Sequence, residues 1–149
     1  MNVVVDTNVV ASAIFFGGKP KEIIDLIMKD KVYAYASKEI LDEYPETIEY
    51  LLNKYSEKKP LTSLSIIQSK IEIINAHSKV NVCRDPDDNK FIECALDSSC
   101  YYIVSGDKDL LCIEKYEDIQ IVTVAEFLKI FENKYAEYEK HQIKKCQHR

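Results

Sequence analysis

The chain has 149 residues, of which 46% are hydrophobic and 30% charged, and its formal net charge is −5 at pH 7. This length and apolar content predict one domain with its own core. The negative charge disfavours a protein that coats nucleic acid by bulk attraction, but it does not exclude a nuclease with an acidic site. No apolar stretch suits a transmembrane helix or a signal peptide, so we expect a cytoplasmic protein without membrane association.

Five cysteines are spread along the chain and form no CxxC pair. Their odd number disfavours a closed disulfide framework. Because free cysteine is among the residues most often buried, Cys94 and Cys112 are predicted to be small apolar core residues.

The first half of the chain predicts strands that alternate with helices. Gly17 and Gly18 end the first helix, and Pro20 suits the first turn of the next one. Ser37 is placed to cap a long helix that Pro45 would kink. The expected strands are 2–5 and 32–36, and the expected helices are 7–16, 21–29, 37–55 and 61–76.

The second half continues this alternation. Thr123 and Glu126 have the spacing of a capping box for the last helix. From residue 133 the chain is polar and basic, which indicates either a helix extension or a disordered segment. We therefore expect one domain over 1–132 and a polar, basic C-terminal tail over 133–149. The other expected elements are an extended run at 80–83, strands at 101–104 and 119–122, and helices at 87–97, 108–113 and 124–131.

Strands that alternate with helices predict an α/β fold with a central parallel sheet flanked by helices on both faces. Such sheets bind ligands at the carboxyl ends of their strands. Acidic residues follow two of the expected strands at this edge. Asp6 comes directly after the first strand, and Asp107 and Asp109 follow the strand at 101–104.

The segment DPDDNKFIECAL has the periodicity of an amphipathic helix. At about 100° per residue, Asp88 lies one turn before Ile92, in the middle of the apolar stripe. Asp88 should therefore point inward at the N-terminus of the helix, where the helix dipole favours an anion. A carboxylate that points inward needs a partner.

The helix expected over 37–55 also carries acidic residues. Glu43 lies on the flank of its apolar stripe, Asp42 lies only slightly further out, and Glu46 lies opposite. The spacing alone favours Glu43 over Asp42 by a small margin.

Four separate segments thus offer carboxylates at strand ends or on inward helix faces. Carboxylates that share a cleft repel each other, and they remain ionised together only if cations compensate them. Oxygen ligands favour a hard cation, Mg²⁺ or Mn²⁺. A metal held by carboxylates, with water still bound, suits the hydrolysis of phosphodiester bonds.

The chain resembles PIN-domain proteins, and in particular the bacterial and archaeal PIN ribonucleases of VapC-type toxin–antitoxin pairs. Four segments carry the resemblance: VVVDTNVVASA, SKEILDEY, RDPDDNKFIECAL and YYIVSGDKDLL. Each segment alone is a weak signal, whereas the four in this order are fairly specific. The resemblance implies a parallel sheet flanked by helices and a metal-dependent ribonuclease site.

Matched to the family's motifs, four acidic residues would be both metal ligands and catalytic groups. The resemblance selects Glu43 over Asp42 and makes Asp109 a candidate fifth ligand. The implied ligands are Asp6, Glu43, Asp88 and Asp107, and the implied neighbours that support them or contact the substrate are Thr7, Asn8, Asn89 and Ser105. The resemblance also implies RNA as the substrate, a small antitoxin as a candidate partner and a homodimer.

Each acidic residue also has a simpler interpretation. Asp6 could cap the helix that follows it, Asp88 could satisfy backbone amides of a first turn, and Glu43 could lie on the surface. Asp107 and Asp109 could form a turn after Gly106.

Other functions also remain open from the sequence. A phosphatase-like enzyme with an aspartyl nucleophile would need a second aspartate at position 8, where the chain has asparagine. A receiver-like signalling domain is disfavoured because no later strand ends in a clear aspartyl nucleophile. A PIN-like module that binds RNA or a partner without cutting is the third alternative.

Overall fold

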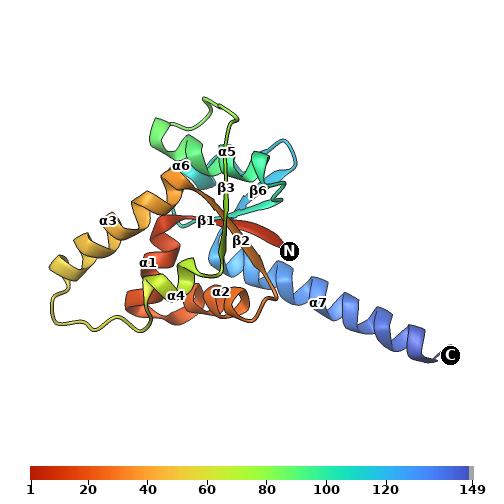
Figure 1. The fold of residues 1–149 in the computed structure, drawn as a ribbon. Coiled ribbons are helices and arrows are strands. Elements are labelled where there is room, and N and C mark those ends of the chain that lie inside the picture. Colours follow the sequence, from red (N-terminus) through yellow and green to blue (C-terminus); the bar gives the residue numbers. More distant parts are fainter. Residues whose placement is uncertain (148–149) are drawn as a thin grey trace.

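The computed structural model describes residues 1–147 as an α/β domain around a six-stranded sheet in the order β3-β2-β1-β4-β6-β5 (Figure 1). The strands are β1 (Asn2–Val5), β2 (Tyr33–Ser37), β3 (Ile71–Ile74), β4 (Tyr102–Val104), β5 (Lys115–Tyr116) and β6 (Ile119–Val122). The helices are α1 (Thr7–Phe16), α2 (Gly18–Met28), α3 (Lys38–Lys54), α4 (Leu64–Gln68), the 3-10 helix η1 (Pro86–Asp88), α5 (Asn89–Asp97), α6 (Lys108–Leu111) and α7 (Val124–Gln147).

The sheet is parallel except for its edge strand β5, which pairs antiparallel with β6. The strand order runs from β1 to β2 and β3 on one side and restarts with β4 on the other. The reversal lies between β1 and β4, and open α/β sheets bind their ligands at such a reversal point. The predicted fold class is confirmed, with β5 as an unforeseen antiparallel addition.

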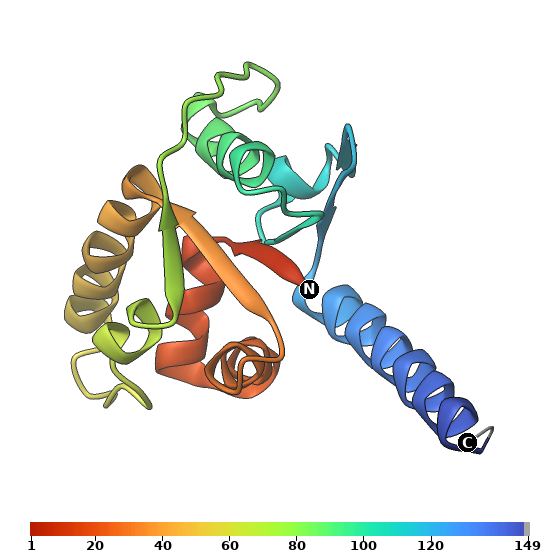
Figure 2. The ribbon, with the colours of Figure 1, turned by 45° about the vertical axis from the view of Figure 1, so that its right-hand side comes forward.

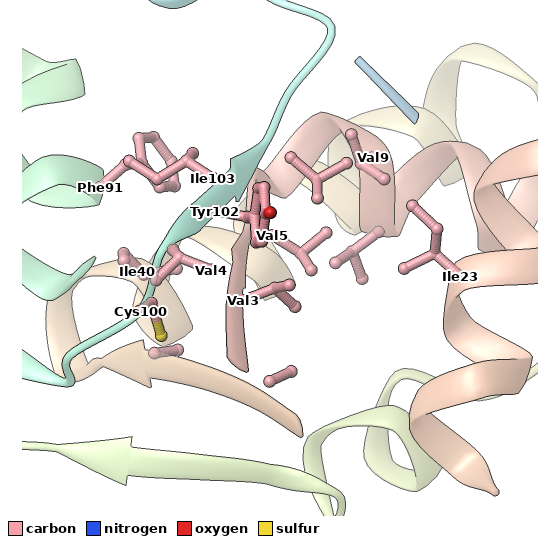
Figure 3. Packing of buried hydrophobic residues seen from close by; sticks show 14 of the residues in the cluster. Val3, Val4, Val5, Val9, Ile23, Ile40, Phe91, Cys100, Tyr102 and Ile103 are labelled. Atoms are coloured by element: carbon pink, nitrogen blue, oxygen red, sulfur yellow. The ribbon is translucent and has the colours of Figure 1, made fainter. Parts of the chain in front are cut away.

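The core lies on both faces of β1. Val3, Val4 and Val5 are at most 2% exposed. Their side chains alternate between the two faces, as strand geometry requires. Figure 3 shows Val4 beside Ile40 of α3, on the same side of β1 as Phe91 of α5, whereas Val3 and Val5 lie on the side of α1 and α2. A strand buried on both faces explains why this segment is continuously apolar.

The helix predicted over 61–76 is wrong. Only the short α4 forms there, and the following residues make the edge strand β3, which pairs in parallel with β2. The β-branched residues of Ile71–Ile74 suit a strand. The apolar pattern of this segment is compatible with a helix or a strand, and pairing with β2 favours the strand. The extended run predicted at 80–83 forms no strand but a loop that precedes η1.

The last helix, α7, runs without a break from Val124 to Gln147. The segment after residue 132 is therefore a helix extension as far as Gln147. The helix leaves the body of the domain, and residues 132–147 are exposed (Figure 2). The last two residues of the predicted tail, 148 and 149, lie outside the described residues. Across residues 1–147, every helix is too short or too polar to span a lipid bilayer.

Of the two cysteines predicted to lie in the core, Cys94 is buried and Cys112 is exposed. Cys94 lies on α5, which packs on the sheet. Cys112 follows the four-residue helix α6, at a position that faces solvent. The prediction for Cys112 is therefore wrong, because a turn this short covers little surface.

Candidate functional site

Asp6 lies at the carboxyl end of the central strand β1, and its surroundings are fixed by β4. The backbone N–H of Asp6 donates to Val104 O at 2.9 Å, which extends the pairing of β1 with β4 past the last strand residue. The Ser105 hydroxyl donates to Asp6 Oδ2 at 2.7 Å, and both side chains are buried. Asp6 is therefore held as an oriented carboxylate at the point where the strand order reverses.

Ser105 also connects Asp6 to Asp107. The backbone N–H of Asp107 donates to Ser105 Oγ at 3.0 Å. Asp107 Oδ1 accepts a 3.0 Å hydrogen bond from the Asp109 N–H and thereby caps α6. The turn interpretation of Asp107 is thus correct for one of its oxygens, and the other Asp107 oxygen is not used by this cap.

Asp88 is the residue immediately before α5, and it faces the same edge of the sheet. Its Oδ2 atom is buried and has no hydrogen-bond partner, and its side chain caps no helix amide. Burial, with the charges of Asp107, Asp85 and Asp6, raises the pKa of Asp88 to about 7. A buried carboxylate oxygen without a partner is costly, and a cation or a proton donor is the kind of group that would satisfy it.

The carboxyl group of Asp6 responds to the same surroundings. Burial raises its pKa above the ordinary value, and the charges of Glu43 and Asp107 raise it further. The hydrogen bond from Ser105 and the nearby N–H of Asn8 act in the opposite direction. The Asn8 N–H lacks the geometry of a capping bond, so Asp6 does not cap α1 with its side chain.

Glu43 lies on α3, whose N-terminus Ser37 caps by accepting from the Ile40 N–H at 3.4 Å. The Glu43 carboxylate is partly buried and contacts the ammonium group of Lys90 on α5. Lys90 also lies 3.4 Å from Asp87 Oδ2. Glu43 is therefore not an isolated surface residue, but in this conformation its carboxylate is directed to a lysine.

The residues predicted to support the acids have different surroundings. The buried Thr7 hydroxyl has no partner, and Asn8 is exposed. Asn89 uses its amide to hold the preceding loop: its Oδ1 accepts from the N–H groups of Val82 and Cys83 at 3.1 and 3.0 Å. Asn89 thus shapes the loop before α5, whereas Ser105 contacts the acids directly.

The structure brings Asp6, Asp88 and Asp107 together around the end of β1, with Glu43 near enough for its charge to act on Asp6. Among residues 1–147, however, no three His, Cys, Asp or Glu side chains converge tightly enough to hold a metal ion. The donors are all carboxylates, which suits Mg²⁺ or Mn²⁺, and Asp88 Oδ2 is unused. The donor chemistry therefore fits a hard cation, with Glu43 directed away from the other acids.

Two hollows flank this group of acids. One, of about 660 Å³, is lined by Asn8, Ser12, Asp107, Lys108 and Asp109 among others. The second, of about 310 Å³, lies on the α3 and α5 side and is lined by Glu39, Asp42, Glu43, Glu46, Asp87 and Lys90.

Sequence reasoning missed two residues at this edge. Lys90 is 9% exposed, which is rare for lysine, and its position beside the apolar stripe of α5 was an available signal. Tyr44 is 1% exposed, and its hydroxyl donates to Val5 O at 3.0 Å, so it fixes α3 against the end of β1.

A family profile, a protein sequence and a solved structure are similar to this chain. The profile of the PIN domain matches residues 2–109. An uncharacterized protein of Methanocaldococcus jannaschii is 40% identical over 147 residues, which cover 89% of this chain and 92% of that protein. The crystal structure of VapBC2 from Rickettsia felis, bound to a DNA fragment from its promoter, is 16% identical with a TM-score of 0.48, and the match covers 83% of this chain and 98% of that one. The profile match extends over most of the chain and includes β1, α3, α5 and β4, and the chain therefore belongs to the PIN domain family.

Proposed function

We propose that this PIN-domain protein is a metal-dependent endoribonuclease that hydrolyses RNA phosphodiester bonds at the carboxyl edge of its sheet. The observation that carries the proposal is the buried, unpartnered Oδ2 of Asp88 beside Asp107 and Asp6, at the strand-order reversal. A protein that keeps such an atom without a partner gains from a ligand that supplies positive charge.

Asp6, Glu43, Asp88 and Asp107 would hold one or two Mg²⁺ or Mn²⁺ ions, with Asp109 as a fifth ligand. The bound cation would supply the charge that polarises the scissile phosphate and lowers the pKa of a water molecule. The resident side chains then have separate tasks. Ser105 orients Asp6 through its 2.7 Å hydrogen bond and fixes Asp107 through its backbone.

The substrate would contact residues on either side of these acids. Asn8 and Lys108 are exposed in the larger hollow, where an amide and an ammonium group can contact a nucleotide's base and phosphate. Thr7, whose buried hydroxyl lacks a partner, would complete its hydrogen bonding at the occupied site. Neither hollow is lined by aromatic residues, on which the bases of single-stranded RNA often stack. Recognition would therefore depend on the shape of the RNA backbone.

Cleavage of defined RNAs by the purified protein tests the proposal. We expect cleavage with Mg²⁺ or Mn²⁺, its loss with EDTA, and its loss in Asp6→Asn, which keeps the volume of the side chain while removing its charge. Circular dichroism and melting would check that the variant is folded. The site assignment is wrong if Asp6→Asn cuts RNA at the wild-type rate.

The proposal includes partners that would act in the cytoplasm. A small antitoxin would bind over the acidic edge and block it, and a second copy of the chain would form a homodimer. Copurification with the product of an adjacent short open reading frame tests the first partner, and light scattering of the purified protein tests the second. A lone gene would instead favour a role in RNA processing.

A non-catalytic binding module is the second candidate function. It is favoured by the absence, within residues 1–147, of three acidic or other ligating side chains that already converge on a metal position. RNA binding without cleavage under any metal condition would support this module over the nuclease.

A further inference from the structure

Lys90 occupies an unusual place for a lysine. Its side chain is 10% exposed, and its ammonium group contacts Glu43 of α3 and lies 3.4 Å from Asp87 Oδ2. The same group lies 5.5 Å from the centre of the Phe91 ring. Of its two acidic partners, Glu43 is partly buried and Asp87 is 78% exposed, so Glu43 is the partner that compensates the buried charge.

The stability of α5 does not explain why the Lys90 ammonium group is buried at this position. Lys90 is the second residue of α5, and the N-terminus of a helix carries partial positive charge. A cation is unfavourable there, whereas Asp88 just before the helix has the favourable sign. The energetic reason for the buried ammonium must therefore lie outside its own helix, in the acidic residues that it faces.

Those residues include a carboxylate that the proposed function needs elsewhere. Glu43 lies close enough to Asp6 for their charges to interact, and Asp6 is joined through Ser105 to Asp107. Tyr44, adjacent in sequence to Glu43, is fixed on Val5 O, so this turn of α3 has a defined place beside β1. Glu43 is therefore carried by a fixed turn of α3, with Lys90 as its ion-pair partner and Asp6 within reach of its charge.

We propose that Lys90 acts as an internal counter-ion that holds Glu43 in the metal-free protein and competes with the metal for this carboxylate. Lys90 thereby sets the metal affinity of the site. This inference rests on the proposed function, because it requires that the acids at the sheet edge bind a divalent cation. It accounts for an arrangement in which Asp88 keeps an unused oxygen while Glu43 is directed to a lysine.

A purely structural salt bridge between α3 and α5 is the competing explanation. Such a bridge would stabilise the fold without changing the intrinsic metal affinity of the acids, apart from the general effect of one positive charge nearby. Lys108 provides a matched control for that general effect. It begins α6 next to Asp107 and Asp109, lines the larger hollow, and forms no ion pair within the described part of the chain.

Titration calorimetry with Mn²⁺ on wild type, Lys90→Gln and Lys108→Gln tests the proposal. We expect Lys90→Gln to bind Mn²⁺ about tenfold more tightly than wild type, in the range of coupling between contacting charged groups, and Lys108→Gln to change the affinity far less. In a Glu43→Gln background, Lys90→Gln should lose its additional gain and match Lys108→Gln. Equal effects of the two lysine substitutions in the wild-type background would overturn the role of Lys90.

Lys90→Arg keeps the measurement decisive if Lys90→Gln does not fold. Arginine can hold a carboxylate through two parallel hydrogen bonds, so this variant should retain Glu43 more firmly and bind Mn²⁺ more weakly than wild type. Unchanged or tighter binding by Lys90→Arg would contradict the proposal. If neither wild type nor any Lys90 variant binds Mn²⁺, the metal requirement of the proposed function fails first, whereas normal wild-type binding with an indifferent Lys90 removes only this inference.

Discussion

The two ends of helix α5 carry partly buried carboxylates in opposite states. Asp88, before the first residue, has an oxygen without a partner and a pKa raised to about 7 by burial and by neighbouring acids. Asp97, the last residue, accepts hydrogen bonds from the backbone N–H groups of His77 and Ser78 at 2.6 and 2.8 Å and from the Ser78 hydroxyl. Burial opposes the ionisation of Asp97, but these hydrogen bonds outweigh burial, and its pKa is lowered.

The helix dipole would predict the reverse, because it favours an anion at the N-terminus and disfavours one at the C-terminus. The surrounding groups therefore decide the outcome at both ends. At Asp97 the fold supplies hydrogen-bond donors, and the carboxylate stabilises the loop that carries them. At Asp88 the fold supplies further carboxylates, which is the arrangement expected where an external cation completes the site.

The largest expected difference between the two ends is in RNA cleavage. Asp88→Asn removes a proposed metal ligand and should lower the cleavage rate at least about 100-fold, as expected for loss of a directly acting electrostatic group. Asp97→Asn, the same chemical change on the same helix, should cut within a few-fold of wild type. Single-turnover cleavage with saturating Mn²⁺ measures both rates. Similar losses in the two variants would mean that α5 matters only as a scaffold.

Stability should show the opposite order. Asp97→Ala removes the acceptor of three hydrogen bonds that hold the loop before η1, and should lower the free energy of unfolding by about 2 kcal/mol. Asp88→Ala should lower the stability of the metal-free protein much less, or raise it, because it removes an unsatisfied buried group. Chemical denaturation in EDTA provides the measurement, and a larger loss in Asp88→Ala would contradict this comparison.

The pH dependence of the metal-free protein should trace to Asp88. Its folded pKa lies above the ordinary value of 3.8, so protonation favours the folded state. That stabilisation is complete below the unfolded pKa and is lost as the pH rises through about 7. Melting temperature in EDTA should therefore fall between about pH 4 and pH 7, the ordinary and the raised pKa of Asp88, and Asp88→Asn should flatten the fall. The interpretation fails if Asp88→Asn retains the wild-type slope, or if Asp97→Asn loses it.

The smallest effect is expected from the exposed end of α7, which bonds neither carboxylate. Truncation after Glu132 removes the Lys134 hydrogen bond to the Tyr102 hydroxyl at 3.1 Å, the contact of Lys31 with the Tyr135 ring at 5.4 Å, and the stacking of Tyr135 on Phe131. The free energy of unfolding should change by only about 1 kcal/mol, because the lysines and Tyr135 are exposed and each contact contributes little. A cooperative loss of folding would show that 133–149 belongs to the domain.

The main features of the acidic edge could be predicted because each depends on local patterns. A three-valine strand that ends in Asp6 places this carboxylate at a strand end, and a helical stripe that begins at Asp88 places that side chain on the inward face of its helix. Neither inference needs knowledge of the rest of the fold. The orientation of Glu43 could not be predicted, because it depends on how α3 and α5 approach each other and on the lysine between them. The strand β3 was missed for a similar reason, since its partner β2 decides between helix and strand.

Stabilisation of the protein by a divalent cation at neutral pH would show whether a metal ion completes the acidic edge. If the carboxyl edge is a site completed by a cation, Mn²⁺ should raise the melting temperature of wild type and of Asp97→Asn by similar amounts, and should raise that of Asp88→Asn much less. The same rise in all three proteins, or no rise in wild type, would contradict a metal site formed by the acids around Asp88.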